Sequence, residues 1–498
     1  MCGYSREGAN RFKQRVLSAS LRGDKKVSDD IWRILCQSSP HLRDNRDVKR
    51  IPRKIKVIGG GLAGPEAALQ AANAGCQVTL YEMRPIKSTE AHQTSDFAEL
   101  VCSNSLKSES ENTAPWLLKQ EMRLAGGQLI RHADATAVPA GHALAVDRIL
   151  FSERVAIDLV QHPNITIKRE EVTTLQEDSE DTLTILASGP LTSAPLTAEL
   201  QRLTGADHLA FYDSIAPIVD ATTINMERVY MAARWDKGTA DYINCPFTKE
   251  EYDVFLDALI DSQTVEEKQW EKLDYFEGCL PIEVTARRGR DTLRFGPMKP
   301  AGLTDPKTGR WPYACVQLRQ ENLRADSYNL VGFQNHIKFG DQQRILRLIP
   351  GLENATFLRY GQIHRNTYIH APSLLTETLQ LKQHPNILIA GQLSGVEGYT
   401  ESIASGMLAG RYAAALAHGQ TPTPAPRQSA HGSLMHYITH AEDSGGGKGK
   451  VSRFQPANIT FDLIPPLEED LRKKIRDKKE RHRLQCERAL EAWNAWLA

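Results

Sequence analysis

A short apolar strand that ends in closely spaced glycines constrains the fold of this chain more than any other feature. The residues KIKVIGGGLAG run from Lys54 to Gly64, and PEAALQAANAG after them has the pattern of a helix. In a strand–turn–helix unit, glycines at these spacings allow a tight turn, close approach of the backbone to a phosphate, and close packing of helix on strand. The pattern therefore predicts a dinucleotide-binding unit whose key glycines are Gly59, Gly61 and Gly64.

A second strand and a distant second segment extend this prediction. The strand QVTLYE ends at Glu82, about 20 residues beyond the turn, where a carboxylate can accept a hydrogen bond from a ribose hydroxyl. Much later, NILIAGQLSGVEG at residues 386–398 repeats the order of strand and glycine turn, and a small-residue helix is expected over 403–418. Together the two segments predict one split, Rossmann-like nucleotide-binding domain of the α/β class.

Composition limits the classes of protein to which the chain can belong. Its 498 residues carry 61 basic and 61 acidic side chains, so no global charge marks a nucleic-acid or membrane protein. Hydrophobic residues make up 41% of the chain, but charges, Gly or Pro interrupt every apolar run before the roughly 18 residues that a membrane span needs. Eight cysteines without CxxC spacing indicate neither a disulfide scaffold nor a metal site. We therefore expect a soluble, cytoplasmic protein with reduced thiols.

Changes in composition and periodicity along the sequence divide the chain into parts. Up to Arg50 the chain holds twelve Arg or Lys against six Asp or Glu, with little periodicity, which favours a loosely ordered extension. The run TLTILASGP at 182–190 predicts another buried strand near the bound nucleotide, and the sheet is expected to resume at YNLVGFQ, 328–334. The predicted parts are the extension (1–53), the first part of the nucleotide-binding domain (54–221), an inserted α+β domain (222–321), the second part (322–420), and a linker with a basic helical tail (421–498).

Cys245 is a candidate for chemistry because a helix is expected to begin close to its sulfur. Pro246 follows it, and Thr248-x-x-Glu251 has the form of a capping box. A helix dipole stabilises a nearby thiolate by only about 0.3–1 kcal/mol, so a nucleophile at neutral pH would also need a nearby cation or base. A buried small hydrophobic residue beside a helix cap is the structural alternative.

Cys102 is the second candidate, and its neighbours are polar. Ser103, Asn104 and Ser105 follow it in SDFAELVCSNSLKSE, and such hydroxyl and amide groups suit a loop that faces a ligand. The local sequence leaves this role and a purely structural role equally open. The other cysteines lie among apolar neighbours or in the tails, and we expect them to be structural or inert.

Basic residues gather in two places where a polyanion could bind. In TARRGRDTLRFGPMKPAGL they alternate with Phe295, which fits phosphate contacts beside a stacking surface, and a solvated charged hairpin is an equal alternative. The tail from Arg472 to Arg483 holds eight basic residues against two acidic ones, which fits either a polyanion contact or a plain surface helix. The candidate contacts of the first cluster are Arg287, Arg288, Arg290, Arg294 and Lys299.

A series of longer strings gives the chain a family resemblance. In order they are VIGGGLAG, EMRP, TEAHQTSDFAELVCSNSLKSES, LASGPLT, FYDSIAPIV, NCPFTKEEYDVF, YFEGCLPIE, TLRFGPMKPAGL, HRNTYI, GQLSGVEGYTESIASG and RDKKER. They extend over residues 54–498, and AELVCSNS and LRFGPMKP are far more specific than the glycine pattern. On these strings the chain resembles the folate- and FAD-dependent tRNA (uracil-5-)-methyltransferase family.

The resemblance implies a fold, a reaction and a set of ligands. It implies a glucose-inhibited-division-protein-A-like FAD domain, a fold shared with the flavoproteins that build carboxymethylaminomethyl-uridine in tRNA. It also implies methylation of carbon 5 of the T-loop uridine (position 54) of tRNA. Methylenetetrahydrofolate supplies the carbon in that reaction, and NAD(P)H reduces FAD, which provides the electrons. The expected macromolecular partner is the T-arm of tRNA.

Residue roles follow from the same resemblance. Cys245 takes the place of the thiol that adds to carbon 6 of uracil and so makes carbon 5 nucleophilic. Cys102 takes the place of a second cysteine near the flavin. Apart from the resemblance, the loop HRNTYIHAP just before the last strand is expected close to the flavin ring, and its His364 and Arg365 are candidate substrate contacts. The FAD contacts that the resemblance implies are Gly59, Gly60, Gly61, Leu62, Ala63, Gly64, Glu82, Gly391 and Gln392.

Two alternatives to this function stay open at the level of the sequence. A member of the same family redirected to ribosomal RNA would use the same residues. A flavin-bearing tRNA chaperone, with catalysis secondary, is the alternative from another class of protein. Two features depart from the family pattern: residues 1–53 have no counterpart, and Pro65 stands where a small residue is usual, in a first helical turn that tolerates proline.

Overall fold

The structure, a computed structural model, describes residues 54–175, 182–205, 209–264, 280–440 and 454–498. The prediction of a loosely ordered extension falls on residues 1–53, outside the described residues. Three of the eight cysteines, Cys2, Cys36 and Cys279, lie outside them as well. The described residues belong to one unit, Pro52–Ala498.

A parallel sheet forms the centre of the nucleotide-binding part. Its five strands lie in the order β16-β7-β1-β2-β6, and every neighbouring pair is parallel. Because β16 comes from the second segment and pairs with β7 of the first, the predicted split fold is confirmed. The buried strand predicted at 182–190 is β7. The bounds are β1 Lys54–Ile58, β2 Val78–Tyr81, β6 Ile165–Lys168, β7 Thr182–Leu186 and β16 Ile387–Ile389.

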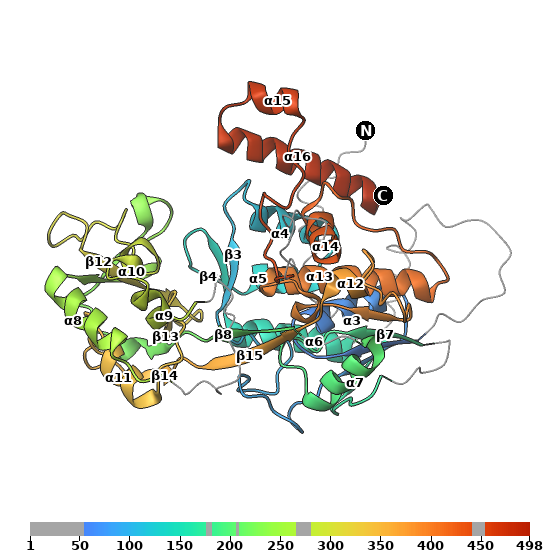
Figure 1. Ribbon diagram of the computed structural model, residues 1–498, viewed down its shortest axis with the longest axis horizontal. Helices are drawn as coiled ribbons and strands as arrows, with labels where there is room; N and C mark the ends of the chain where they lie inside the picture. The colour runs from blue at the N-terminus through green and yellow to red at the C-terminus, as the bar shows by residue number, and fades with distance from the viewer. Residues whose placement is uncertain (1–53, 176–181, 206–208, 265–279, 441–453) are drawn as a thin grey trace, which may run out of the picture. The chain divides into compact units, whose positions relative to one another are not determined.

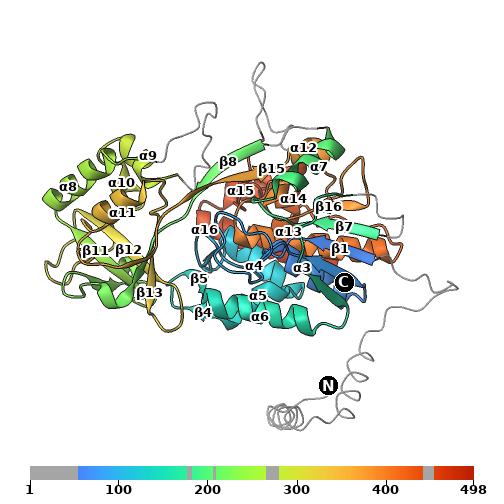
Figure 2. The same ribbon diagram turned by 90° about the horizontal axis from the view of Figure 1, so that it is seen from below.

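Two of the helices that cover this sheet come from the two distant segments. α3 (Ala63–Asn73) follows β1, and α13 (Tyr399–Ala417) confirms the helix predicted over 403–418. They lie side by side against the sheet (Figure 2). A Cβ atom at Gly406 of α13 would lie 2.3 Å from the carbonyl oxygen of Ala63, so this approach requires glycine. The other helices of this part are α4 Ala114–Leu124, α5 Gln128–Ala135, α6 Arg148–Gln161, α7 Ala194–Thr204, α12 Ala371–Leu374 and α14 Ala430–His440.

The inserted region folds around a second, antiparallel sheet. Its six strands lie in the order β10-β11-β12-β13-β9-β14. Apolar side chains of this sheet pack with those of α8, α9 and α11 into a core of their own, and Figure 1 shows these elements together. The bounds are β9 Ile218–Asp220, β10 Tyr230–Ala232, β11 Tyr242–Phe247, β12 Ala314–Gln320, β13 Ser327–Leu330, β14 Phe357–Arg359, α8 Lys249–Ile260, α9 Ile282–Arg287, α10 Thr292–Phe295 and α11 Phe339–Leu346.

One strand expected in the parallel sheet belongs to the antiparallel sheet. The run at 328–334 is predicted to resume the parallel sheet, but β13 pairs with β12 and β9, so that prediction is wrong. A short apolar run fits either kind of sheet, and its partners are chosen by contacts far away in the sequence. The domain boundaries at 222 and 321 stay a prediction. Sheet membership of β9 and β14 favours a longer insertion, over residues 218–359.

A two-stranded antiparallel ribbon connects the two parts. It pairs β8 (Leu209–Ser214) with β15 (Ile363–Tyr368), and Figures 1 and 2 show it running from one sheet towards the other. The segment with His364 and Arg365 is thus a strand, and its prediction as a loop is wrong. Their place near the flavin ring stays a prediction. A small third sheet, in the order β3-β5-β4, consists of β3 Ser105–Ser108, β4 Ala137–Val138 and β5 Ala143–Val146.

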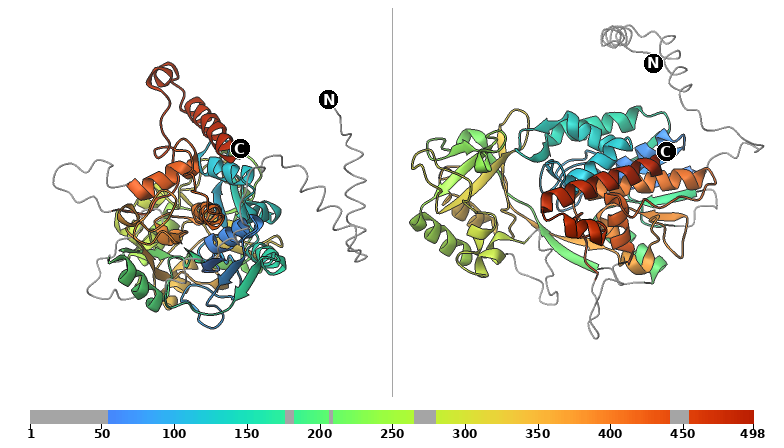
Figure 3. Two further views of the ribbon diagram at one scale, coloured as in Figure 1. Left: turned by 90° about the vertical axis from the view of Figure 1, so that its right-hand side faces the viewer. Right: turned by 90° about the horizontal axis from the view of Figure 1, so that it is seen from above.

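The basic tail is helical, as predicted, and packs on the nucleotide-binding part. α15 (Glu469–Lys474) and α16 (Lys478–Leu497) are the red helices at the surface in Figure 3. Trp493 of α16 is fully buried, stacks on His431 with ring centroids 4.5 Å apart, and donates a 2.8 Å hydrogen bond to the carbonyl oxygen of Glu121. Neither α16 nor any other described helix is both long and apolar enough to span a membrane.

Replacing Gly406 with alanine tests how far the fold depends on the contact between α13 and α3. The added methyl group would meet backbone atoms of α3, so we expect Gly406→Ala to lower the free energy of unfolding by about 1–3 kcal/mol. Gly340→Ala on α11 is the matched control, because no described atom lies within 4 Å of its Cβ position. Thermal unfolding followed by circular dichroism compares both, and a Gly406→Ala protein as stable as wild type would contradict this role.

Candidate active site

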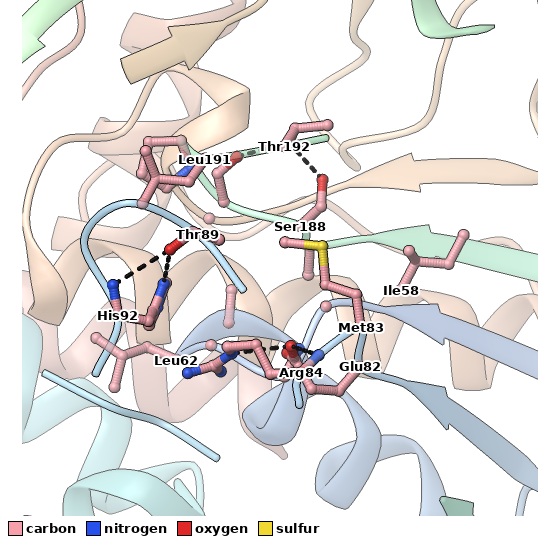
Figure 4. Close-up of a pocket in the computed structure, with 18 of the residues that line it drawn as sticks. Ile58, Leu62, Glu82, Met83, Arg84, Thr89, His92, Ser188, Leu191 and Thr192 are labelled. Carbon is pink, nitrogen blue, oxygen red and sulfur yellow. Dashed lines mark hydrogen bonds and ion pairs between the residues drawn. The ribbon is translucent and has the colours of Figure 1, made fainter. Parts of the chain in front are cut away.

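A large pocket opens at the carboxyl ends of the parallel strands. Its empty volume is about 1140 Å³, including space that opens to solvent, and this is ample for a nucleotide cofactor. Its walls are the glycine turn after β1, the end of β2 and residues 187–193 after β7, and Figure 4 shows side chains from all three. Ligands of open α/β sheets bind at this edge.

The glycine turn after β1 is set by close backbone contacts. Gly59 has φ +114°, and a Cβ atom there would lie 2.2 Å from the carbonyl oxygen of Ala187, at the end of β7. A Cβ atom at Gly64 would lie 1.9 Å from the carbonyl oxygen of Gly59. Both positions therefore require glycine for packing of the turn. Gly61 is different, because no described atom lies within 4 Å of its Cβ position, and the space beside it is left for a ligand.

The start of α3 faces this open space. Its N-cap residue is Leu62, and no described side chain caps the helix. Uncapped amide groups of a first turn, together with the helix dipole, form a ready site for a phosphate. The open position at Gly61 and the uncapped helix thus fit the pyrophosphate of a cofactor such as FAD.

Glu82 is held rigidly at the end of β2. Its two carboxylate oxygens accept hydrogen bonds from the Gly60 amide at 2.7 Å and from the Arg84 amide and side chain, both at 2.9 Å. Burial by itself raises the pKa of Glu82, but the bonds from Arg84 outweigh it and lower the pKa below its usual range. Glu82 is therefore ionised at neutral pH, and its remaining lone pairs suit a ribose hydroxyl.

The second segment closes the same pocket. Gly391 and Gln392 both line it. Gly391 has φ +73°, donates a 2.8 Å hydrogen bond to Ser405 Oγ on α13, and would place a Cβ atom only 3.0 Å from that of Ala63. Of the predicted FAD contacts, only Gly64 is missing from the described residues that line the pocket, because it packs beneath the turn.

Cys102 lies in the wall of this pocket, against the half-buried Tyr399. The Tyr399 hydroxyl oxygen accepts hydrogen bonds from the amides of Cys102 at 2.7 Å and Ser103 at 3.3 Å, and it lies 3.0 Å from Cys102 Sγ. The two amides occupy the lone pairs of the oxygen, so the hydroxyl proton is directed at the sulfur. Burial, and next the neighbouring sulfur, raise the pKa of Tyr399 well above its usual value, so it keeps that proton at neutral pH.

Two guanidinium groups hold the loop that carries Cys102. Arg148 and Arg359 both donate hydrogen bonds to the carbonyl oxygen of Val101, and Arg148 also forms an ion pair with Glu321. Both arginines lie close enough to Cys102 for a direct electrostatic interaction. Positive charge beside a thiol favours its ionised form, so this environment suits a reactive cysteine.

The same loop is tied to the antiparallel sheet. Asn104 is fully buried, and its amide donates hydrogen bonds to the carbonyl oxygens of Val146 and, at the end of β12, Gln320. Arg319 of β12 donates in return to Asn104 Oδ1 at 3.0 Å and to Ser103 Oγ at 2.7 Å. The polar residues that follow Cys102 thus position its loop against the inserted region.

Cys245 lies in the core of the inserted region, and the described residues that line the pocket do not include it. It stands on β11 and is fully buried. Burial, and next the neighbouring Cys315 and Glu353, raise the pKa of Cys245 well above its usual value. The predicted capping box is confirmed, since Thr248 and Glu251 cap the start of α8 reciprocally. α8 begins at Lys249, soon after Cys245 in the chain, but Cys245 belongs to the core of the insertion while Cys102 lines the pocket.

The predicted RNA contacts of the insertion lie on and beside two short helices, α9 and α10, rather than on a hairpin: Arg287 ends α9 and Arg294 belongs to α10. Arg290 forms ion pairs with Asp253 and Asp257, and Arg294 lies over the Tyr313 ring at 3.7 Å. Among the described residues, none of this cluster lines the pocket, and its role stays a prediction. The remaining members are exposed: Arg287, Arg288 and Lys299.

Four residues of the site were missed by reasoning from the sequence. Arg84 follows Glu82 in EMRP, and Tyr399 directly follows the last glycine turn in GYTES, so both stood beside recognised features. Arg148 and Arg359 stand in no pattern that points to a thiol in another part of the chain. Only the fold brings these two arginines to Cys102.

The fold and the pocket define a class of protein: a split dinucleotide-binding α/β protein with a thiol in the wall of its cofactor pocket. The family described as glucose inhibited division protein A matches residues 54–421. In Koribacter versatilis (strain Ellin345), the methylenetetrahydrofolate--tRNA-(uracil-5-)-methyltransferase TrmFO is 66% identical over 445 residues, which are 89% of this chain and 98% of that protein. The protein of the same name in Solibacter usitatus (strain Ellin6076) is 58% identical over 445 residues, 88% of this chain and 98% of that protein.

A solved structure supports the same fold. GidA of Aquifex aeolicus, in its form II crystal, is similar with a TM-score of 0.62 at 17% sequence identity, over 91% of this chain and 75% of that one. This chain belongs to the glucose inhibited division protein A family and, within it, to the methylenetetrahydrofolate--tRNA-(uracil-5-)-methyltransferases. The resemblance read from the sequence strings is thereby confirmed.

Alkylation of the native protein tests the contrast between the two thiols. Iodoacetamide reacts with the thiolate, and each unit by which the pKa of a thiol is raised lowers the thiolate fraction about ten-fold. We therefore expect Cys102 to be labelled at neutral pH at least about ten-fold faster than the buried Cys245. Peptide mass spectrometry over time measures both rates, with Cys486, whose pKa burial raises to about 12, as the slow control. Equal rates would contradict the geometry described for Cys245.

Proposed function

We propose that this protein methylates carbon 5 of the T-loop uridine of tRNA in the cytoplasm. It takes the carbon from methylenetetrahydrofolate and uses FAD and NAD(P)H for reduction. The observation that carries the proposal is the 66% identity, over nearly the whole length of both chains, to a protein named for this reaction. The pocket and its thiol are consistent with it.

The proposed FAD site consists of residues from both segments. The amides at the start of α3 would hold the pyrophosphate, and Glu82 would hold the ribose. Gly391 and Gln392 would meet the cofactor from the opposite segment. When bound, FAD supplies the electrons that reduce the transferred carbon to a methyl group.

Thiol chemistry on the base follows from the reactivity of uracil. Carbon 5 of uracil is a poor nucleophile. When a thiolate adds to carbon 6, carbon 5 becomes part of an enolate and can attack an electrophilic methylene group. Cys102 stands in the pocket wall with the Tyr399 hydroxyl directed at its sulfur, which suits proton transfer or adduct chemistry beside the cofactor. The proposed nucleophile is Cys245, as the family resemblance implies.

In the structure described here Cys245 is closed off from any base. The proposed role therefore requires that β11 and the start of α8 open when RNA binds, and that the buried thiol becomes accessible in the complex. If it does not, Cys102 is the remaining candidate for the nucleophile among the described cysteines that line the pocket.

An assay with omitted components tests the reaction. We expect the purified protein to be yellow and to methylate an unmodified T-arm transcript only when methylenetetrahydrofolate and a reduced nicotinamide are both present. Mass spectrometry of digested RNA detects 5-methyluridine. Methyl transfer from S-adenosylmethionine instead would contradict the proposal. A ribosomal RNA transcript assayed in parallel tests the alternative target.

Covalent trapping on RNA with 5-fluorouracil at the target position tests the thiol roles. We expect Cys245→Ala to lose the trapped complex while keeping FAD, because the proposed nucleophile for carbon 6 is then absent. Cys315→Ala is the matched control, since Cys315 is equally buried on the neighbouring strand. The complex is measured by denaturing gel electrophoresis, and bound flavin by its absorbance.

Alkylation in the presence of RNA separates the possible outcomes. Faster labelling of Cys245 in the complex supports the required opening of β11. Trapping that survives in Cys245→Ala and disappears in Cys102→Ala would transfer the nucleophile role to Cys102. Normal cellular function of the double variant would instead favour the tRNA chaperone.

A further inference from the structure

An exposed tryptophan of the insertion is held in a backbone conformation that bulky residues avoid. Trp235 lies in a 3₁₀ turn, η2 (Arg234–Asp236), with φ 60° and ψ 25°. Asp236 next to it also has a positive φ, 51°. Residues other than glycine rarely adopt this left-handed backbone conformation, and they keep it only where surrounding contacts fix them. Such conformations gather at functional sites, so the contacts of Trp235 are informative.

Hydrogen bonds clamp this turn to a second segment of the insertion. The Trp235 amide donates a 2.7 Å bond to the carbonyl oxygen of Gly302. The Arg234 side chain donates to the carbonyl oxygen of Ala301 at 2.8 Å and to Gln317 Oε1 on β12 at 3.0 Å. The Trp235 amide and the side chain before it are therefore fixed by partners that lie 67 and more residues away in the chain.

The indole ring of Trp235 has one supported face. A Cβ atom at Gly302 would lie 2.7–2.8 Å from three atoms of the ring, so the ring lies directly on this buried glycine. Trp311 braces the ring from the side, with ring centroids 5.1 Å apart and the planes at 86°. Trp235 is nevertheless 56% exposed and Trp311 49%. The fold thus presents a flat aromatic surface to solvent at the cost of backbone strain.

The two segments that form the surface around this ring carry more basic than acidic residues. The two segments that form it, 234–238 and 298–311, hold five basic residues against two acidic ones, and one of the acids, Asp305, is buried. A positive surface around an exposed aromatic ring is complementary to a nucleic acid, in which bases stack and phosphates carry negative charge. The exposed basic residues are Lys237, Lys299, Lys307 and Arg310.

We propose that Trp235, supported by Gly302 and braced by Trp311, stacks on an unpaired base of the RNA substrate. The neighbouring basic residues contact the phosphates of the same loop. This inference rests on the proposed function, because it takes a structured RNA with an unpaired loop as the ligand. It adds an aromatic contact to the predicted basic cluster, with which it shares Lys299, while Arg290 and Arg294 of that cluster are already paired within the insertion.

Binding of two RNA probes to the full-length, FAD-loaded protein tests this contact. The probes are a fluorescein-labelled T-arm hairpin and a fully paired duplex of the same stem, and fluorescence anisotropy measures both affinities. We expect Trp235→Ala to bind the hairpin about ten-fold more weakly, because stacking on each base contributes on this scale, and to bind the duplex unchanged. Trp235→Phe keeps an aromatic face and should retain most of the affinity.

Two further variants separate stacking from general effects. Gly302→Ala removes no aromatic group, but its methyl group would displace the ring, so it should weaken hairpin binding as Trp235→Ala does. Phe339→Ala is the matched control: Phe339 is 63% exposed in the same insertion and makes an edge contact with Tyr360, with ring centroids 5.7 Å apart. It should bind both probes like wild type. Circular dichroism and flavin content confirm that each variant is folded.

The outcomes distinguish this inference from the proposed function. Hairpin binding by Trp235→Ala equal to wild type would overturn the stacking contact, and so would an equal loss for hairpin and duplex. The first result would leave the exposed ring for a protein partner instead. If Trp235→Ala weakens hairpin binding as expected but the wild-type protein shows no folate-dependent methylation, only the proposed function is refuted.

Discussion

The close approach of α13 to α3 is the contact on which the rest of the structure depends. These helices come from opposite ends of the nucleotide-binding part, and the pairing of β16 with β7 brings their two segments to one sheet. Glycine at position 406 lets the backbone of α13 rest directly on the start of α3 at Ala63. The same approach places Gly391 against Ala63. This packing, together with the pairing of β16 with β7, brings the two halves of the cofactor pocket together.

The thiol environment is a direct consequence of that packing. Tyr399 is the first residue of α13, so the position of this helix sets the position of its hydroxyl group. Cys102 stands on a loop of the first segment, and its sulfur meets that hydroxyl at 3.0 Å. A tyrosine hydroxyl whose lone pairs are filled by two amides has one direction left for its proton. The geometry therefore assigns Tyr399 as the donor and the sulfur as the acceptor.

Reasoning from the sequence succeeded where the signal was local. The glycine turn, the strand ending at Glu82 and the capping box at Thr248 are each decided within a few residues, and the structure confirms all three elements. It failed where contacts between residues far apart in the sequence determine the pairing of strands. The residues of β13 read equally well as a strand of either sheet, and only pairing with β9 and β12 settles the matter.

In the candidate site, too, reasoning from the sequence found the residues with a local signal and not those that depend on the fold. Gly61, Glu82 and Gly391 were found because each sits at the end of a recognisable strand. The sequence left the burial of Cys245 open as the structural alternative, since a cysteine before a capping box has the same sequence whether its strand faces a cleft or a core. The strained turn at Trp235 was also invisible, because no residue near it suggests a left-handed conformation.

A buried polar network joins the pocket to the inserted region, and it explains why the two parts belong to one chain. Across the boundary, Arg319 donates a hydrogen bond to Asn104, and Arg148 forms an ion pair with Glu321. Removing one partner of such a pair leaves a buried polar or charged group unpaired, which is far more costly than the net gain from forming the pair. The loop that carries Cys102 therefore keeps its geometry only while β12 stays in place. A substrate that binds the insertion and shifts β12 would act directly on the thiol at the cofactor pocket.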